Sequence, residues 1–218
     1  MSDDRLKVDA ETLYAQLRDS LRAALVTDVG AGAQQDAASA GAQVQAGMHD
    51  ALAGVVASPV GAAVDEAVTQ AAPGDASGVA MIGIHSGGAW LAERLHHDLQ
   101  LTGPLGFLSS SFYRDDVGTR GFGGALHATK IDFDVTGRHI VLVDDILHTG
   151  RTTRAALNEI FDYGRPASVR LAVLIDRGGR ELPFHPDHVG AVIALKPGER
   201  FVLSQQTSGV FDLRIEGN

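Results

Sequence analysis

The chain has 218 residues, 44% of them hydrophobic and 21% charged, which is enough for one α/β domain with a substantial core. It contains no cysteine, which excludes disulfide bonds, thiolate metal sites and cysteine nucleophiles. The net charge is −9 and disfavours general nucleic-acid binding, which depends on Lys and Arg neutralising phosphates. Residues 1–78 hold four basic and eleven acidic residues, whereas residues 79–218 hold 14 basic and 16 acidic residues. The composition of residues 79–218 is therefore compatible with a local basic face.

The first part of the chain predicts a helix over residues 9–26. Leucines recur every fourth position from Leu13 to Leu25, and Asp9 and Thr12 fit a helix start. The leucine stripe is typical of a packing face. The opening segment, MSDDRLKVDAETLY, lacks the apolar core of a signal peptide, and no apolar run reaches the length of a transmembrane helix. We therefore expect a cytoplasmic protein with no membrane partner.

The stretch 30–78 differs from the rest of the chain. Sixteen Ala and eight Gly make up about half of it, and it has no Lys, Arg or aromatic residue. Such a segment buries little apolar surface for the entropy lost on ordering it. We predict a poorly ordered insertion after an N-terminal helix region (1–29), with weak Ala-rich helices at 44–56 and 60–72.

Strand and helix patterns alternate from residue 79 onward, and the apolar strands are continuous. This pattern predicts an α/β domain over 79–218, with a mainly parallel central sheet flanked by helices. The predicted strands are 79–85, 105–114, 126–133, 139–145, 169–176, 192–195, 201–204 and 210–215, and the predicted helices are 89–99 and 150–163.

The segment Ile140 to Thr152, IVLVDDILHTGRT, has the most specific chemistry in the chain. An apolar strand (140–143) delivers two aspartates, Asp144 and Asp145, to its carboxyl end, where ligands bind in open α/β sheets. The carboxylates can accept hydrogen bonds from a vicinal diol or lie near a divalent cation. The following TGRT opens a helix, whose free N–H groups and hydroxyls suit a phosphate. One segment therefore predicts a ribose-phosphate site. It is neither a Walker A loop nor a dinucleotide fingerprint.

This segment resembles the signature of type I phosphoribosyltransferases for 5-phosphoribosyl-1-pyrophosphate (PRPP). With it, FYRDD at 112–116, GRPASVRLAVLIDRGGRELP at 164–183 and the helix LAERL at 91–95 resemble the pyrimidine operon regulatory protein/uracil phosphoribosyltransferase (PyrR) family. The resemblance runs from about Ile82 to about Gln205, and the helix at 9–26 fits that family's first helix.

The resemblance implies a role for each part of the PRPP segment. Asp144 and Asp145 would contact the ribose hydroxyls and, with Mg²⁺ as cofactor, lie near the metal. The 5′-phosphate would be held by the five residues His148, Thr149, Gly150, Arg151 and Thr152.

Two further loops complete the implied site. The pyrophosphate loop would be His85, Ser86, Gly87 and Gly88, where the family more usually has Lys-Thr-Arg-Gly. Because His85 and Gly87 replace two cations, Mg²⁺ or Arg114 would have to carry more of the charge. Arg114, in the Gly-rich loop RDDVGTRGFGG, would stabilise the departing pyrophosphate, as could Arg120.

Three aspartate or arginine positions near the next strands are open to more than one interpretation. Asp176 and Arg177 would help to form the base pocket, although a buried Asp beside an Arg is equally a structural ion pair. Asp187 resembles an aspartate near magnesium in purine relatives, acting through water. The motif HPDH also permits a zinc hypothesis with His185, Asp187 and His188, although three such residues are more often surface residues.

Three functions follow from the resemblance. The first is Mg²⁺-dependent transfer of phosphoribose from PRPP to uracil, giving UMP and pyrophosphate, together with regulation of pyrimidine biosynthesis by sensing uridine nucleotides. The second is a non-enzymatic sensor of UMP or UTP that binds pyr leader mRNA, for which Arg138, Arg151, Arg154, Arg165 and Arg170 could form a basic face through dimer symmetry. The third is a purine or xanthine phosphoribosyltransferase. The family also implies a homo-oligomer, a dimer or higher.

Overall fold

The computed structural model describes residues 9–41, 79–109 and 128–217, with side chains from 26 to 41 left out. Its contacts divide the chain into two compact units, Met1–Ala23 with Ser77–Asn218, and Ala24–Ala76. The second unit is described only over Ala24–Gly41, which is helical.

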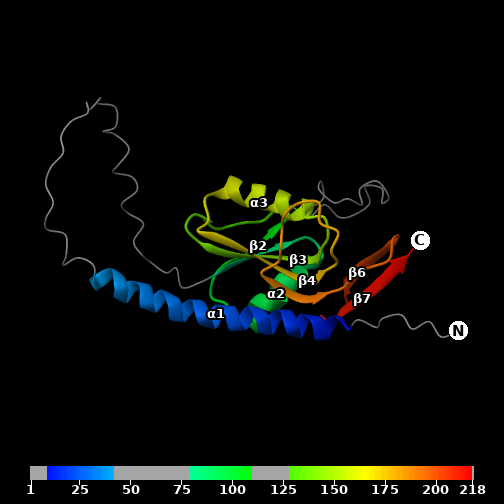
Figure 1. Ribbon diagram of the computed structural model, residues 1–218, viewed down its shortest axis with the longest axis horizontal. Helices are drawn as coiled ribbons and strands as arrows, with labels where there is room; N and C mark the ends of the chain where they lie inside the picture. Colours follow the sequence, from blue (N-terminus) through cyan, green and yellow to red (C-terminus); the bar gives the residue numbers. More distant parts are fainter. Residues whose placement is uncertain (1–8, 42–78, 110–127, 218) are drawn as a thin grey trace, which may run out of the picture. The chain divides into compact units, whose positions relative to one another are not determined.

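A five-stranded sheet, entirely parallel, forms the centre of the first unit (Figure 1). Its spatial order is β2 (Leu105–Leu108), β1 (Ala80–Ile84), β3 (His139–Leu147), β4 (Ser168–Asp176) and β5 (His188–Val192). An antiparallel hairpin, β6 (Glu199–Gln205) and β7 (Phe211–Gly217), follows the last strand. The predicted fold class, a mainly parallel sheet flanked by helices, is confirmed.

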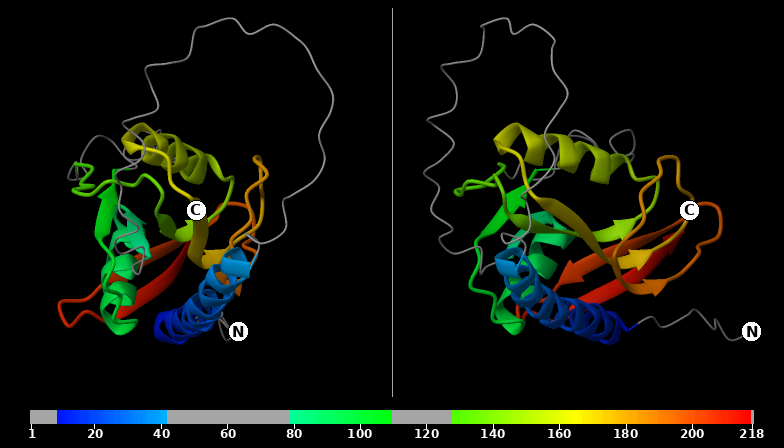
Figure 2. Two further views of the ribbon diagram at one scale, coloured as in Figure 1. Left: turned by 90° about the vertical axis from the view of Figure 1, so that its left-hand side faces the viewer. Right: turned by 60° about the vertical axis from the view of Figure 1, so that its left-hand side comes forward.

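Helices cover both faces of the sheet because successive strand residues point to opposite sides. Val141 and Val143 pack toward α2 (Gly87–Asp98), the beginning of α1 (Ala10–Gly41) and the hairpin. Ile140 and Leu142 pack toward α3 (Arg151–Tyr163) on the other face. Figure 2 shows from two further directions that α3 lies on one face of the sheet and α2 with the beginning of α1 on the other. Among the described residues, no helix is both long and apolar enough to cross a membrane.

The predicted N-terminal helix is confirmed at its start and wrong at its end. Asp9 caps it, accepting hydrogen bonds from the backbone N–H groups of Glu11 (3.3 Å) and Thr12 (3.2 Å). The leucine stripe is buried from Leu13 to Leu21. The helix then continues to Gly41, well past the predicted residue 26. Alanine has the highest helix propensity, so an Ala-rich sequence can stay helical without burying much surface. The helices predicted at 44–72 lie outside the described residues, and the predicted domain boundaries stay a prediction.

Several strand boundaries differ from those predicted, because pairing with a neighbour decides where a strand ends. The strand that carries the PRPP segment continues past the aspartates, since its pairing with β4 extends to Leu147 opposite Asp176. The fifth strand is 188–192 rather than 192–195. In place of a strand at 126–133, the described part contains one antiparallel bridge, between Lys130 and Phe107.

An ion pair between helices ties the start of α1 to α2 and to the hairpin. Both oxygens of the Glu11 carboxylate accept hydrogen bonds from Arg94, each at 2.7 Å, and Oε1 also accepts the N–H of Phe211 (2.8 Å). The Arg94 guanidinium carbon lies 4.2 Å from the ring centroid of Tyr14. These contacts fix the axis of α2, whose first residues belong to the predicted pyrophosphate loop.

Replacing Gly190 with alanine should destabilise the protein by about 2 kcal/mol, a typical cost of overpacking. A Cβ at Gly190 would lie 2.6 Å from the carbonyl oxygen of Leu174 and 2.7 Å from that of Leu13, so β5 or α1 would have to move. Thermal unfolding measures the change. Gly217→Ala is the matched control, because its Cβ would meet only the side chain of Glu199 at 3.6 Å. Equal melting temperatures for the two variants would contradict the close packing of α1 on β5.

Candidate functional site

The predicted site lies where the direction of the sheet's connections changes. β1 has β2 on one side and β3 on the other, and the helices that follow β1 and β3 cover opposite faces. In such sheets a crevice opens outside the carboxyl ends of the two central strands. The loops after β1 and β3, which are the predicted pyrophosphate loop and PRPP segment, therefore meet there.

The two aspartates of the PRPP segment are held by the backbone at the end of β3. Asp144 is 4% exposed, and its Oδ1 accepts the N–H of Asp145 at 2.9 Å. Asp145 is half-buried, and its Oδ1 accepts the N–H of Ile146 at 3.0 Å. These hydrogen bonds orient both carboxylates at the carboxyl end of the strand.

The loop after β1 packs directly against this pair, which the sequence did not reveal. A Cβ added to Gly87 would lie 2.6 Å from Cγ of Asp145, and one added to Gly88 would lie 2.9 Å from Cα of Asp144. Only residues without a side chain allow this approach. The His85–Ser86 peptide bond is cis, and the His85 ring lies 5.5 Å from that of Phe107. The structure thus brings the predicted pyrophosphate loop and the acidic pair together.

The residues predicted to hold the 5′-phosphate, 148–152, are called the phosphate cradle, and they connect β3 to α3. Gly150 has φ +89°, a left-handed conformation that favours glycine, and the helix begins at the next residue. Thr149 is buried, and its Oγ1 accepts the N–H of Arg151 at 3.3 Å. The first turn of α3 is the anion-binding end of the helix. Arg151 itself points to Glu181, with its Nη2 2.5 Å from Oε2, so its charge is already paired.

The sequence interpretation gave the segment 178–184 no role at the cradle, yet the segment packs against it. The N–H groups of Glu181 and Leu182 both donate to the carbonyl of Thr149 at 3.0 Å. Arg180 donates to the carbonyl of His148 at 2.7 Å. The available signal was the pair Gly178–Gly179, both with φ +72°, which turns the chain back toward the cradle.

Asp176 and Arg177 lie at the end of β4, and the contacts of Asp176 favour the ion-pair alternative. Its Oδ2 lies 2.5 Å from Nη2 of Arg180, and its Oδ1 accepts the N–H of Gly178 at 2.8 Å. Burial tends to raise the pKa of Asp176, but the Arg180 and Gly178 hydrogen bonds outweigh it and the pKa is lowered. The partner is Arg180 rather than the neighbouring Arg177, whose Nη2 lies 3.4 Å from the carbonyl of Glu199.

The structure does not bring Asp187 to the acidic pair. Its Oδ2 accepts the N–H of Leu171 at 2.7 Å, so its carboxylate is used at the start of the β4–β5 pairing. Leu171 lies in the first half of β4, whereas Asp144 is opposite Val173 further along that strand. The zinc hypothesis has no support either: among the described residues no three His, Asp or Glu side chains are placed so that they could hold one metal ion, and Nδ1 of His188 lies 3.0 Å from Oγ of Ser20.

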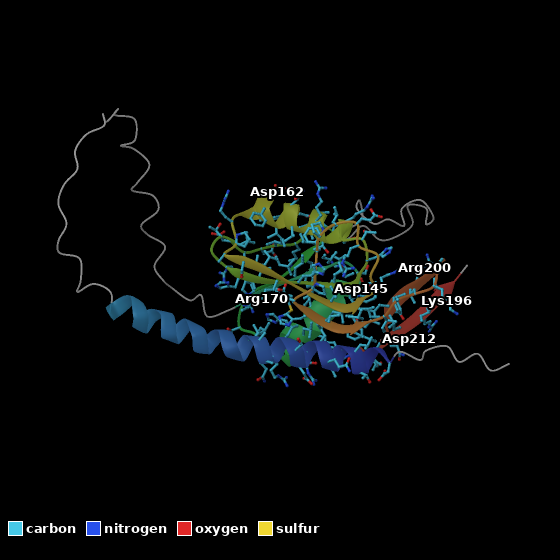
Figure 3. All side chains as sticks on the ribbon, viewed as in Figure 1. Asp145, Asp162, Arg170, Lys196, Arg200 and Asp212 are labelled. Atoms are coloured by element: carbon cyan, nitrogen blue, oxygen red, sulfur yellow. The ribbon has the colours of Figure 1, made fainter. Side chains whose placement is uncertain are left out.

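The arginines proposed for a basic face fall into two groups. Arg138 and Arg165 lie beside the start of β3, where the carbonyl of Arg165 accepts the N–H of Gly137 at 2.8 Å. Arg151 and Arg154 are at the other end of the sheet, at the start of α3. Figure 3 shows Arg170 and Asp145 at opposite ends of the sheet. These side chains therefore form no single patch within one chain. Arg114 and Arg120 lie outside the described residues.

Replacing Thr153 with valine should stabilise the protein by about 1 kcal/mol, because removing a buried unsatisfied hydroxyl removes its desolvation cost. Thr153 is 2% exposed, and its buried Oγ1 has no hydrogen-bond partner among the residues that the structure describes. Denaturant unfolding measures the change, with the exposed Thr102→Val as control. A loss of stability would mean that the hydroxyl has a partner such as a buried water.

Sequence comparison places the chain beside known phosphoribosyltransferases. The family model of the phosphoribosyl transferase domain matches residues 59–191, more than half of the chain. A protein from Nitrosococcus oceani, "Bifunctional protein PyrR", is 54% identical over 127 residues, covering 57% of this chain and 72% of the relative. The protein of that name from Pseudomonas syringae pv. tomato is 50% identical over 123 residues, covering 56% and 72%.

Solved structures show the same fold. The hypoxanthine phosphoribosyltransferase of Trypanosoma cruzi superposes with a TM-score of 0.50 at 18% identity, covering 85% of this chain and 79% of that chain. A mutant of this enzyme in a ternary substrates complex gives 0.51 at 19% identity with the same coverage. At this identity the likeness concerns the fold alone. The sequence relatives go further, and the chain belongs to the phosphoribosyltransferases and, among them, to the family of the bifunctional PyrR proteins.

Proposed function

We propose that the protein transfers phosphoribose from PRPP to uracil, giving UMP and pyrophosphate, and that it helps to regulate pyrimidine biosynthesis by sensing uridine nucleotides. One observation carries the proposal: the aspartate pair, the phosphate cradle and a glycine loop meet at the carboxyl ends of β1 and β3, in a chain about half identical to PyrR proteins over its matched part. The crevice offers acceptors for a ribose diol and N–H donors for phosphate.

In this proposal each wall of the crevice holds one part of PRPP. Asp144 and Asp145 accept the ribose hydroxyls, residues 148–152 hold the 5′-phosphate, and residues 85–88 face the pyrophosphate. Asp176 and Arg177 remain the candidates for the side of the base, and Arg114 for the departing pyrophosphate. Uracil N1 forms a bond to C1′ as the bond from C1′ to the pyrophosphate oxygen breaks, and N1 loses its proton. The rate comes from positioning and electrostatics, without a covalent nucleophile.

The residues at the crevice fit Mg²⁺ bound together with PRPP. Mg²⁺ prefers oxygen ligands and usually combines one or two carboxylates with substrate phosphates. Asp145 suits this role, because it is half-buried beside the pyrophosphate loop and its Oδ1 is oriented by the N–H of Ile146 at 3.0 Å. When bound, the ion would neutralise phosphate charge that residues 85–88 leave unpaired, since none of them is Lys or Arg. Asp187 is left out of this proposal because its carboxylate binds the backbone of β4.

A direct assay tests the enzymatic part. The protein is incubated with PRPP, Mg²⁺ and one base, either uracil, hypoxanthine or guanine, and the nucleotide formed is measured. We expect UMP with uracil only. Turnover of a purine without UMP would replace the substrate assignment with the purine alternative. UMP binding without turnover of any base would favour the non-enzymatic sensor.

RNA binding is the second candidate activity, favoured by the relatives' shared description as bifunctional. The net charge of −9 and the separation of the arginines into two groups mean that a basic face would need a second copy of the chain. Filter binding of pyr leader RNA against a scrambled RNA tests this part, with the oligomeric state measured alongside. No preference for the leader would exclude it. We further propose that the protein acts in the cytoplasm as a dimer or larger homo-oligomer.

A further inference from the structure

The segment 178–184 contacts each residue at the start of the phosphate cradle. A Cβ at Gly179 would lie 2.8 Å from Nε2 of His148, so the ring packs on this glycine. A Cβ at Gly150 would lie 2.9 Å from the ring of Phe184. Glu181 pairs with Arg151. Together with the N–H groups that reach Thr149, these contacts make the segment the outer wall of the cradle.

Arg180 is the central residue of this wall. Its guanidinium donates to the carbonyls of Phe184 (Nε, 2.9 Å), His148 (Nη1, 2.7 Å) and Leu147 (Nη1, 3.3 Å), as well as to Asp176. Its side chain is only 17% exposed, and that of Asp176 is 15% exposed. A buried guanidinium needs such neutralisation and such acceptors. Because its charge is matched by Asp176, Arg180 acts on the backbone rather than as a free cation for the substrate.

The wall binds three consecutive backbone carbonyls, one at the end of β3 and two in the cradle. Arg180 binds those of Leu147 and His148, and residues 181 and 182 bind that of Thr149. In a planar trans peptide unit the C=O and the following N–H point in opposite directions. The N–H groups of His148, Thr149 and Gly150 therefore point away from the wall. Successive N–H groups aimed to one side form a concave anion site.

We infer that Arg180 is a positioning residue for the 5′-phosphate: it holds the carbonyls of 147 and 148, and so aims the N–H groups of 148 and 149 at the phosphate. This inference rests on the proposed function. It also implies that lysine cannot replace Arg180, because one ammonium group cannot reproduce a planar fork that binds a carboxylate and four carbonyls, the fourth being that of Gly178 at 3.5 Å.

The test compares UMP with uridine, which differ only by the phosphate. Calorimetry gives the dissociation constants for wild type, Arg180→Lys and Arg180→Gln. We expect both variants to lose about tenfold in UMP affinity, the size of one charge-assisted hydrogen bond, with uridine affinity unchanged. In steady state the KM for PRPP should rise more than kcat falls. Arg200→Lys is the matched control, since Arg200 forms an exposed pair with Glu216 on the hairpin.

A second measurement uses the wild-type protein, so that the inference can be tested even if the Arg180 variants fail to fold. Amide resonances of His148, Thr149 and Gly150 should shift on adding UMP and not on adding uridine. Equal loss of UMP and uridine affinity in Arg180→Lys, or no phosphate-dependent shift at these amides, would overturn the inference. If the wild type binds UMP no better than uridine, the proposed phosphate site itself fails. If the wild type binds UMP more tightly than uridine and Arg180→Lys keeps the same ratio of the two dissociation constants, only this inference fails.

Discussion

Replacing Asp145 with asparagine is expected to lower kcat/KM for PRPP by about 100-fold, while the fold stays intact. An amide keeps the Oδ1 atom that accepts the N–H of Ile146, so the side chain keeps its place. It puts an NH₂ group where Oδ2 would accept a ribose hydroxyl or bind a cation. Losing hydrogen bonds to an ionised acceptor costs about 1.5–3 kcal/mol each, which accounts for the magnitude.

Steady-state kinetics with varied PRPP measure this effect, and circular dichroism checks the fold. Asp162→Asn is the matched control, because Asp162 is an exposed residue of α3 at the end of the sheet away from Asp145 (Figure 3). Asp144→Asn should give a loss of similar size with an added cost in stability, since Asp144 is buried. An unchanged KM and kcat for Asp145→Asn would reject its assigned role.

The second large effect is expected at Gly88, where alanine should reduce kcat/KM by about 100-fold and destabilise the protein by about 2 kcal/mol. A methyl group at this position would overlap the carbonyl oxygen of Val143 and lie 2.9 Å from Cα of Asp144. The loop after β1 and the end of β3 would then have to separate. A shift of about 1 Å in a positioned group can cost 100-fold in rate.

Gly190→Ala separates the expected loss of activity in Gly88→Ala from its expected loss of stability. It overpacks the sheet against α1 to a similar degree, yet it lies on β5, away from the loop after β1. The folded fraction of Gly190→Ala should therefore keep its activity, whereas Gly88→Ala should lose activity even at temperatures where it is fully folded. Equal specific activities in the two variants would show that contact between residue 88 and β3 does not position the site.

The features that the sequence predicted correctly are encoded over a few neighbouring residues. The leucine spacing from Leu13 to Leu21 indicated the buried face of the first helix, and Asp9 indicated its cap. The apolar strand, the aspartate pair and the Gly150 turn follow one another directly along the chain. Their order alone therefore placed the aspartates at the carboxyl edge of the sheet and Gly150 at the start of a helix. Local periodicity and capping are short-range properties, and a single segment shows them.

The features that the sequence missed depend on which strands become neighbours. Gly87 lies against Asp145 because β1 pairs with β3, and no local pattern states that pairing. Asp187 looked like a metal ligand from its motif, yet the pairing of β4 with β5 turns its carboxylate to the backbone of Leu171. Asp176 had an arginine beside it in sequence, but the turn at Gly178 and Gly179 gave it Arg180 instead.

The sequence by itself therefore determined the family, the phosphoribosyltransferases of the PyrR type, and predicted a ribose-phosphate site on one strand–helix connection. Only the tertiary structure decided how that site is supported. The sheet order brings a glycine loop against the aspartates, and the return of the chain after β4 binds the carbonyl of Leu147 and two carbonyls of the cradle. The physical reason is that a substrate-binding segment needs particular residue types in sequence, whereas its orientation depends on hydrogen bonds and packing from segments that folding brings beside it.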